Sequence, residues 1–99
     1  MYIVREIMHC RPGKVRPMVE KFKAMSALME KLGMSGFWIL TDVIGPPYWT
    51  VTAELEVENL EAFFKMDDKA FADAGAAEIM AGYYDLVDHG RREIYKVER

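Results

Sequence analysis

The feature that most constrains this chain is a change of period at Val15. From there, apolar side chains recur every third or fourth position as far as Leu32, and charged residues fill the other side. This spacing predicts an amphipathic helix. Pro17 falls in its first turn, where a missing N–H breaks no helical hydrogen bond. Gly33 suits a left-handed cap at its end.

Segments typical of β-strands flank this helix. Tyr2–Cys10 precedes it and ends at a Pro-Gly turn, which predicts a strand. Ser35–Gly45 and Tyr48–Val57 follow it, with Gly-Pro-Pro between them, and are expected to form an antiparallel hairpin. After the second helical region, Arg91–Val97 is expected to form the last strand.

Two further helices are expected between the hairpin and the last strand. Asn59 is a good N-cap for a short helix, which we expect Asp67-Asp68 to interrupt. A second helix is expected from about Ala76 and carries apolar residues as far as Val87. The resulting order, βαββαβ, predicts a ferredoxin-like α+β fold with one four-stranded antiparallel sheet and helices on one face. Residues 1–99 are expected to form one domain.

Apolar residues on both faces of the predicted strands indicate a homodimer. Ile3, Val4, Ile7 and Met8 place large groups on both sides of the first strand, and residues 37–40 do the same in the second. Because helices cover only one face of a single sheet, the other face needs a second apolar surface. Two copies closing sheet against sheet would form a dimeric α+β barrel. The alternative is a monomer with a few exposed apolar side chains, which are common.

Composition excludes several classes of partner. The formal net charge of −3 gives no long-range attraction for nucleic acid or for anionic membranes. No apolar run approaches the roughly 20 residues of a membrane span. Cys10 is the single cysteine, which fits a reducing compartment, and we expect a cytoplasmic protein.

In the order of these segments, the chain resembles the dimeric α+β-barrel superfamily, and most of all the NIPSNAP-type domains. The resemblance rests on Arg11-Pro12-Gly13-Lys14 before a helix with Phe22, on the turn Ile44-Gly45-Pro46, and on the acidic passage from Glu54 into the helix at Leu60. It implies the fold and the dimer. The superfamily includes cofactor-independent monooxygenases, isomerases, cyclases and haem-degrading enzymes. Where NIPSNAP-type first strands usually carry Arg and Tyr, this chain has Glu6 and Met8.

Three residues are candidates for proton transfer: Glu6, His9 and Tyr83. Alternation along the first strand points Glu6 toward the helices, where a carboxylate needs a cationic partner such as Arg91 or Arg92, or else a raised pKa. His9 is a candidate base or haem ligand, and a strand-end histidine without chemical role is the alternative.

Aromatic residues are the candidates for ligand contact, namely Trp38, Phe63 and Tyr84, although such residues are more often plain core. His89 lies four residues after Asp85, a weak spacing for a metal, and no recognised metal motif is present, so we expect neither metal nor cofactor. The sequence predicts a pocket for a small hydrophobic or aromatic molecule, with monooxygenase, isomerase or cyclase chemistry if the protein is an enzyme. A non-catalytic ligand-binding or assembly module and a haem-binding protein are the alternatives.

Overall fold

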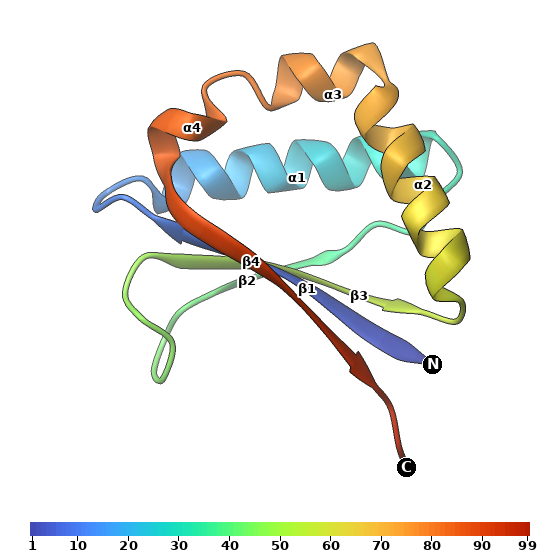
Figure 1. Ribbon diagram of the computed structural model, residues 1–99. Coiled ribbons are helices and arrows are strands. Elements are labelled where there is room, and N and C mark those ends of the chain that lie inside the picture. Colours follow the sequence, from blue (N-terminus) through green and yellow to red (C-terminus); the bar gives the residue numbers. More distant parts are fainter.

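A computed structural model describes residues 1–99 and shows a twisted sheet with all of its helices on one face (Figure 1). The elements in chain order are β1 (Tyr2–Cys10), α1 (Val15–Lys31), β2 (Trp38–Thr41), β3 (Thr50–Val57), α2 (Leu60–Ala72), α3 (Ala74–Ile79), α4 (Tyr83–Leu86) and β4 (Val87–Lys96). The four strands pair antiparallel in the order β2-β3-β1-β4. The predicted ferredoxin-like α+β fold is therefore confirmed.

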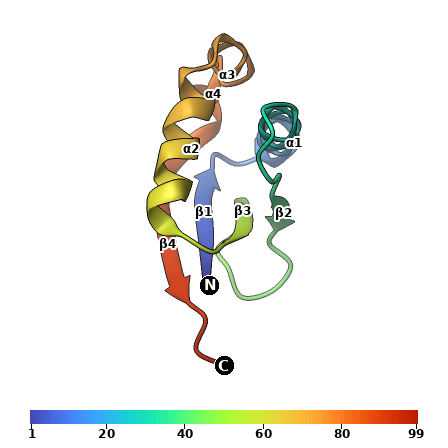
Figure 2. The same cartoon turned by 90° about the vertical axis from the view of Figure 1, so that its right-hand side faces the viewer.

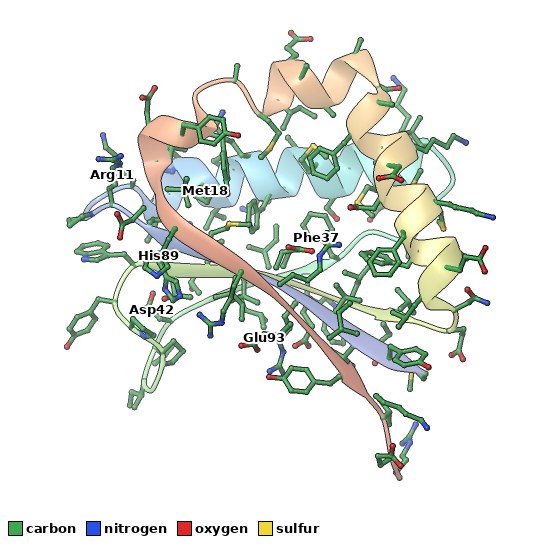
Figure 3. All side chains as sticks on the ribbon, viewed as in Figure 1. Arg11, Met18, Phe37, Asp42, His89 and Glu93 are labelled. Carbon is green, nitrogen blue, oxygen red and sulfur yellow. The ribbon has the colours of Figure 1, made fainter.

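The helix predicted from the change of period is α1, and it supplies much of the core. Its apolar face packs on the sheet, with Met18 fully buried and Phe22 6% exposed. The helix ends before Gly33, whose φ of 83° lies in the left-handed region that glycine adopts most readily. Met18 and Phe37 both point into the layer between helices and sheet (Figure 3). None of the helices is long and apolar enough to span a membrane.

The two faces of the sheet meet different surroundings. Even-numbered residues of β1, such as Glu6, Met8 and Cys10, face the helices, whereas Arg5 and Ile7 face the opposite side. Seen from the side, α1 lies over the β2 edge and α2 on the β4 edge, and no helix covers the other face (Figure 2). We call this other side the open face.

The hairpin is shorter than the sequence predicts. The predicted strand Ser35–Gly45 is reduced to the four residues of β2, and β3 begins at Thr50 rather than Tyr48. The intervening loop holds two prolines, which cannot donate to a strand ladder, and Trp49 has a positive φ of 67°. The Asp42 carboxylate closes the loop instead, because it accepts a hydrogen bond from the Thr50 N–H at 2.9 Å.

Two predicted helix limits and one predicted strand limit in the second half of the chain are wrong. Asn59 caps α2 as expected, accepting the Ala62 N–H at 2.9 Å, but α2 continues through Asp67 and Asp68 without interruption. The helix expected from about Ala76 to Val87 is divided into α3 and α4, because Gly82 adopts a left-handed φ of 81°. The last strand consequently begins at Val87, four residues earlier than predicted.

Candidate functional site

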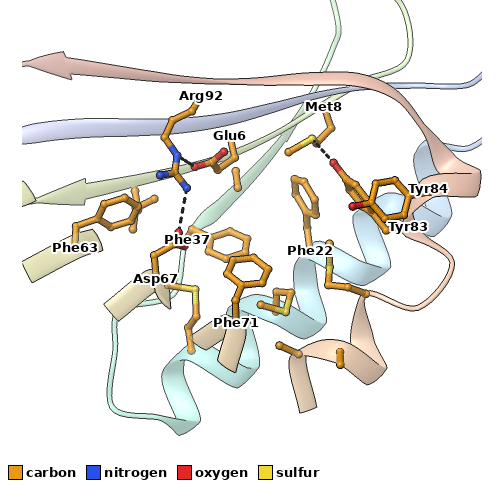
Figure 4. Close-up of a pocket in the computed structure, with 17 residues that line it drawn as sticks. Glu6, Met8, Phe22, Phe37, Phe63, Asp67, Phe71, Tyr83, Tyr84 and Arg92 are labelled. Carbon is orange, nitrogen blue, oxygen red and sulfur yellow. Dashed lines mark hydrogen bonds and ion pairs between the residues drawn. The ribbon is translucent and has the colours of Figure 1, made fainter. Parts of the chain in front are cut away.

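An apolar cavity of about 410 Å³ lies between the helices and the helix-facing side of the sheet. Its volume is within the range typical of small-molecule sites. Of the 17 residues that line it, 14 are hydrophobic. Most of the lining is aromatic or thioether in character, supplied by Phe22, Phe37, Phe63, Phe71, Tyr83, Tyr84, Met8, Met25, Met29 and Met80 (Figure 4).

Three charged side chains meet at one end of the cavity. Glu6 and Arg92 are directly opposite each other in the β1–β4 register, and Arg92 Nε donates to the Glu6 carboxylate. Arg92 Nη2 donates to Asp67 Oδ2 at 3.2 Å, which connects the sheet to α2. The guanidinium carbon also lies 5.4 Å from the ring centre of Phe63 and 5.9 Å from that of Phe64. A single cation is thus shared by two carboxylates and lies beside two rings.

The environment of Glu6 makes its carboxyl a weaker acid than an ordinary glutamate. Burial raises the pKa of this carboxyl, and the charge of Asp67 adds to the effect, whereas the hydrogen bond and charge of Arg92 oppose it without cancelling it. Its side chain remains 26% exposed, so the carboxyl can exchange protons with solvent or with a bound molecule. A carboxylate in an apolar cavity with such a pKa has the properties of a general acid or base.

Tyrosines border the cavity at its other end. The Tyr83 hydroxyl lies 2.9 Å from Met8 Sδ, and burial raises the pKa of that phenol. Tyr84 packs edge-on against Tyr83 and is 83% exposed, so it forms part of the rim (Figure 4). The structure therefore brings Glu6 and Tyr83 to one cavity, with Phe63 and Tyr84 in its lining.

His9 lies on the open face, away from this cavity. Arg91 Nη1 lies 2.8 Å from His9 Nε2, and since arginine can only donate, Nε2 accepts and Nδ1 carries the proton. Nδ1 then donates to Thr50 Oγ1, which in turn donates to the Pro47 carbonyl oxygen. Burial lowers the pKa of His9, and the neighbouring His89 and Arg91 lower it further. Because both ring nitrogens have partners, a role as haem ligand would require this chain of hydrogen bonds to break.

Two other sequence candidates also lie outside the cavity. Trp38 pairs with Glu54 across β2 and β3, and its side chain is 64% exposed beyond the cavity lining. His89 contacts Asp88 rather than Asp85 and stacks on His9, with ring centres 4.5 Å apart. No group of three or more His, Cys, Asp or Glu side chains is placed to hold a metal ion.

Asp67 is the cavity residue that sequence reasoning missed. It was interpreted as part of a helix break, although Phe63, Asp67 and Phe71 follow one another at intervals of four and so share one helical face. An acidic residue in the middle of an apolar helical stripe is the signal that indicates a charged group directed at the core or at a cavity.

Comparison of the sequence with protein-family models and with curated proteins gives no match. Solved structures do match. A NIPSNAP family protein of unknown function from Agrobacterium tumefaciens superposes with a TM-score of 0.84 at 14% identity, covering 100% of this chain and 89% of that one. A NIPSNAP-like domain protein from Burkholderia xenovorans gives a TM-score of 0.82 at 16% identity, covering 98% and 84%.

A putative antibiotic biosynthesis monooxygenase from Nitrosomonas europaea matches over the full length of both chains, with a TM-score of 0.72 at 14% identity. The predicted resemblance is thus confirmed at the level of the fold. This chain has the ferredoxin-like α+β fold found in NIPSNAP family proteins and in proteins described as antibiotic biosynthesis monooxygenases.

Proposed function

We propose that the protein binds a small, mostly apolar or aromatic molecule in the cavity and exchanges a proton with it through Glu6. The observation that carries this proposal is a carboxyl group with a raised pKa in the wall of a cavity whose lining is mostly apolar. A purely structural acidic residue paired with arginine ordinarily has a lowered pKa. Cofactor-free isomerase, cyclase or monooxygenase chemistry begins with such a proton transfer.

The charge arrangement is suited to moving a proton, because the total charge at this end of the cavity is the same before and after the transfer. Ionised Glu6 would accept a proton from an acidic O–H or C–H bond of the bound molecule. The bonding electron pair would stay on that molecule and make it an anion. Arg92 lies at the same end of the cavity, so the guanidinium that had balanced Glu6 could then balance the new anion. Tyr83, at the other end, would position the far part of the molecule.

A non-catalytic binding module is the alternative. In that case the cavity is the same, but the role of the Glu6–Arg92–Asp67 network is to hold α2 against the sheet. The two possibilities differ in the effect of Glu6→Gln. This variant would abolish turnover in an enzyme, whereas in a binding module it would change only stability or affinity.

We also propose that the open face joins two copies of the chain. Trp38 and Leu40 are 64% and 43% exposed on that face at the β2 edge, and Tyr95 is 47% exposed on it at the β4 edge. Light scattering at micromolar concentration should give twice the 11.4 kDa chain mass. Trp38→Glu or Leu40→Glu should shift the protein toward monomer or aggregate. A wild-type protein of monomer mass would reject this part of the proposal.

Occupation of the cavity can be tested with a neutral fluorescent probe, N-phenyl-1-naphthylamine, which brightens in apolar sites. Ala77 is exposed at the cavity wall, so Ala77→Trp should fill the cavity and weaken probe binding at least about tenfold. Ala74→Trp is the matched control, because Ala74 is exposed on the same helix but does not line the cavity. Equal binding by both variants would show that the probe, and by extension the ligand, does not enter this cavity.

A further inference from the structure

Acidic groups outnumber basic ones at the charged end of the cavity. Among the 17 lining residues, Glu6, Asp67 and Arg92 are the three with charged side chains. Two carboxylates against one guanidinium leave one negative charge in excess when both acids are ionised. If Glu6 takes up a proton, the balance becomes neutral. In neither state does the cavity present a positive charge of its own to a ligand.

Both nearby carboxylates are already bound to Arg92. Its Nε donates to Glu6 and its Nη2 donates to Asp67, and the guanidinium lies beside the rings of Phe63 and Phe64. An incoming anion that binds the remaining donors of the guanidinium would stand close to these two carboxylates. The repulsion between the anion and the carboxylates is weakly screened in a mostly apolar cavity.

The carboxylate oxygens, by contrast, have capacity left. A carboxylate has about four acceptor positions on its two oxygens, and each one here receives a single hydrogen bond from Arg92. A ligand with an N–H or O–H group could donate to Asp67 or Glu6 without displacing Arg92. Aromatic walls add to this preference, because the faces of phenylalanine rings attract cations and not anions.

We infer that the pocket selects aromatic molecules whose polar group is a neutral or cationic hydrogen-bond donor, and that Asp67 determines the selectivity against organic anions. This inference rests on the proposed ligand-binding function and names its ligand class. Glu6 is matched by Arg92 in the strand register, whereas Asp67 reaches the same guanidinium from α2 and brings the second negative charge. The selected class agrees with the proton transfer proposed above, since the ligand enters with its proton and becomes an anion only by giving it to Glu6.

Two probes with one ring skeleton provide the test. N-Phenyl-1-naphthylamine is neutral and has an N–H donor, and 8-anilino-1-naphthalenesulfonate adds a sulfonate to the same rings. We expect the wild-type protein to bind the neutral probe at least about tenfold more tightly, because the sulfonate meets two carboxylates. Ala77→Trp should weaken binding of the neutral probe at least about tenfold, which would show that the signal comes from the cavity.

Variants that remove a charge with little change of shape then identify the residue responsible for the selectivity. Asp67→Asn should reduce the ratio of the two probes' dissociation constants at least about fivefold, mainly because the anionic probe binds more tightly. Asp68→Asn is the matched control, because it removes the same charge from the next, exposed residue of α2, which does not line the cavity. Glu6→Gln should narrow the difference as well, which keeps the test valid if Asp67→Asn is poorly folded.

The failures of the two proposals are distinguishable. If both probes bind the wild type equally, or if folded Asp67→Asn changes the ratio of the two dissociation constants no more than Asp68→Asn does, the selectivity inference is wrong while the binding cavity stands. If Asp67→Asn does not fold, an unchanged ratio in Glu6→Gln has the same meaning. If Ala77→Trp leaves the neutral probe bound as before, the ligand-binding function itself is wrong.

Discussion

Replacement of Arg92 by methionine is the perturbation that most directly probes the charged end of the cavity. Methionine keeps an apolar stem beside Phe63 and Phe64 and removes the guanidinium. Glu6 and Asp67 then lose the cation they share and are left near each other without compensation. The resulting loss of folding stability should be large for partly exposed groups, and it should depend strongly on pH.

The magnitude can be bracketed from exposure. Removing one partner from a fully buried ion pair costs about 3–5 kcal/mol, and removing one from an exposed pair costs about 0–1 kcal/mol. The side chains here are 34% exposed for Arg92, 26% for Glu6 and 25% for Asp67, so they lie between these limits. We expect Arg92→Met to lower the free energy of unfolding by about 2 kcal/mol at pH 7.

The pH dependence has a defined sign. Glu6 already has a pKa raised above its ordinary 4.5, and loss of Arg92 removes the two influences that lower it. An acid with a raised folded-state pKa binds its proton more tightly in the folded chain, so stability falls as the pH rises through that window. The cost of Arg92→Met should therefore shrink to below about 1 kcal/mol near pH 4.5, where the Glu6 carboxyl can be protonated.

Urea denaturation at pH 7 and near pH 4.5 measures this difference. Lys65→Met is the control, because Lys65 also pairs with a carboxylate of α2, with its Nζ 3.4 Å from Glu61 Oε1. The two side chains are 76% and 81% exposed, so loss of this pair should cost about 0–1 kcal/mol. Equal losses for the two variants, or a loss for Arg92→Met that does not change with pH, would refute the reasoning.

Three further predictions concern single residues. Glu6→Gln should leave the free energy of unfolding at pH 7 within about 1 kcal/mol of the wild-type value, because the lost contact with Arg92 is offset by removal of a partly buried charge. A loss above about 3 kcal/mol would show that the Glu6–Arg92 pair is structural. Burial, with His89 and Arg91, lowers the pKa of His9, so the unfolded chain binds a proton more readily below about pH 6.5 and stability is lost as the pH falls. His9→Gln should reduce the loss of stability as the pH falls through that range. An unchanged dependence of stability on pH would contradict a lowered pKa of His9. Gly90→Ala should destabilise the fold by about 1–3 kcal/mol in thermal denaturation, because the added Cβ would lie 2.6 Å from Met8 Sδ and 3.1 Å from the Ile7 carbonyl oxygen. An unchanged stability would mean that β1 and β4 can separate at this position.

Strand alternation and helical period carried most of the information about the fold. Alternation placed Glu6 on the helix side of β1, and the order of segments placed an arginine-rich last strand within reach of it. The structure pairs Glu6 with Arg92 and puts Arg91 on the opposite face with His9. The same alternation would have separated Glu6 from His9, because residues an odd number of positions apart on a strand face opposite sides. Treating them as one catalytic set overlooked this consequence.

Element boundaries were less predictable because backbone conformation and tertiary packing determine them. Gly82 divides the predicted helix through a left-handed φ that no periodicity reveals. Asp67 and Asp68 do not interrupt α2, since Asp67 finds a guanidinium partner on β4 that lies 25 residues further along the chain. An apolar residue such as Phe63 is expected at a cavity from its helical spacing alone. The place of Asp67 there depends on its contact with Arg92, which is distant in the sequence.

Methionine methyl NMR tests the central claim most directly, because the chain has eight methionines and four of them line the cavity. Titration of ¹³C-methyl-methionine protein with N-phenyl-1-naphthylamine should shift the signals of Met8, Met25, Met29 and Met80. The signals of Met1, Met34 and Met66 should stay in place. Shifts confined to this second group, or saturable binding that leaves the four cavity methionines unchanged, would contradict a ligand-binding cavity between the helices and the sheet.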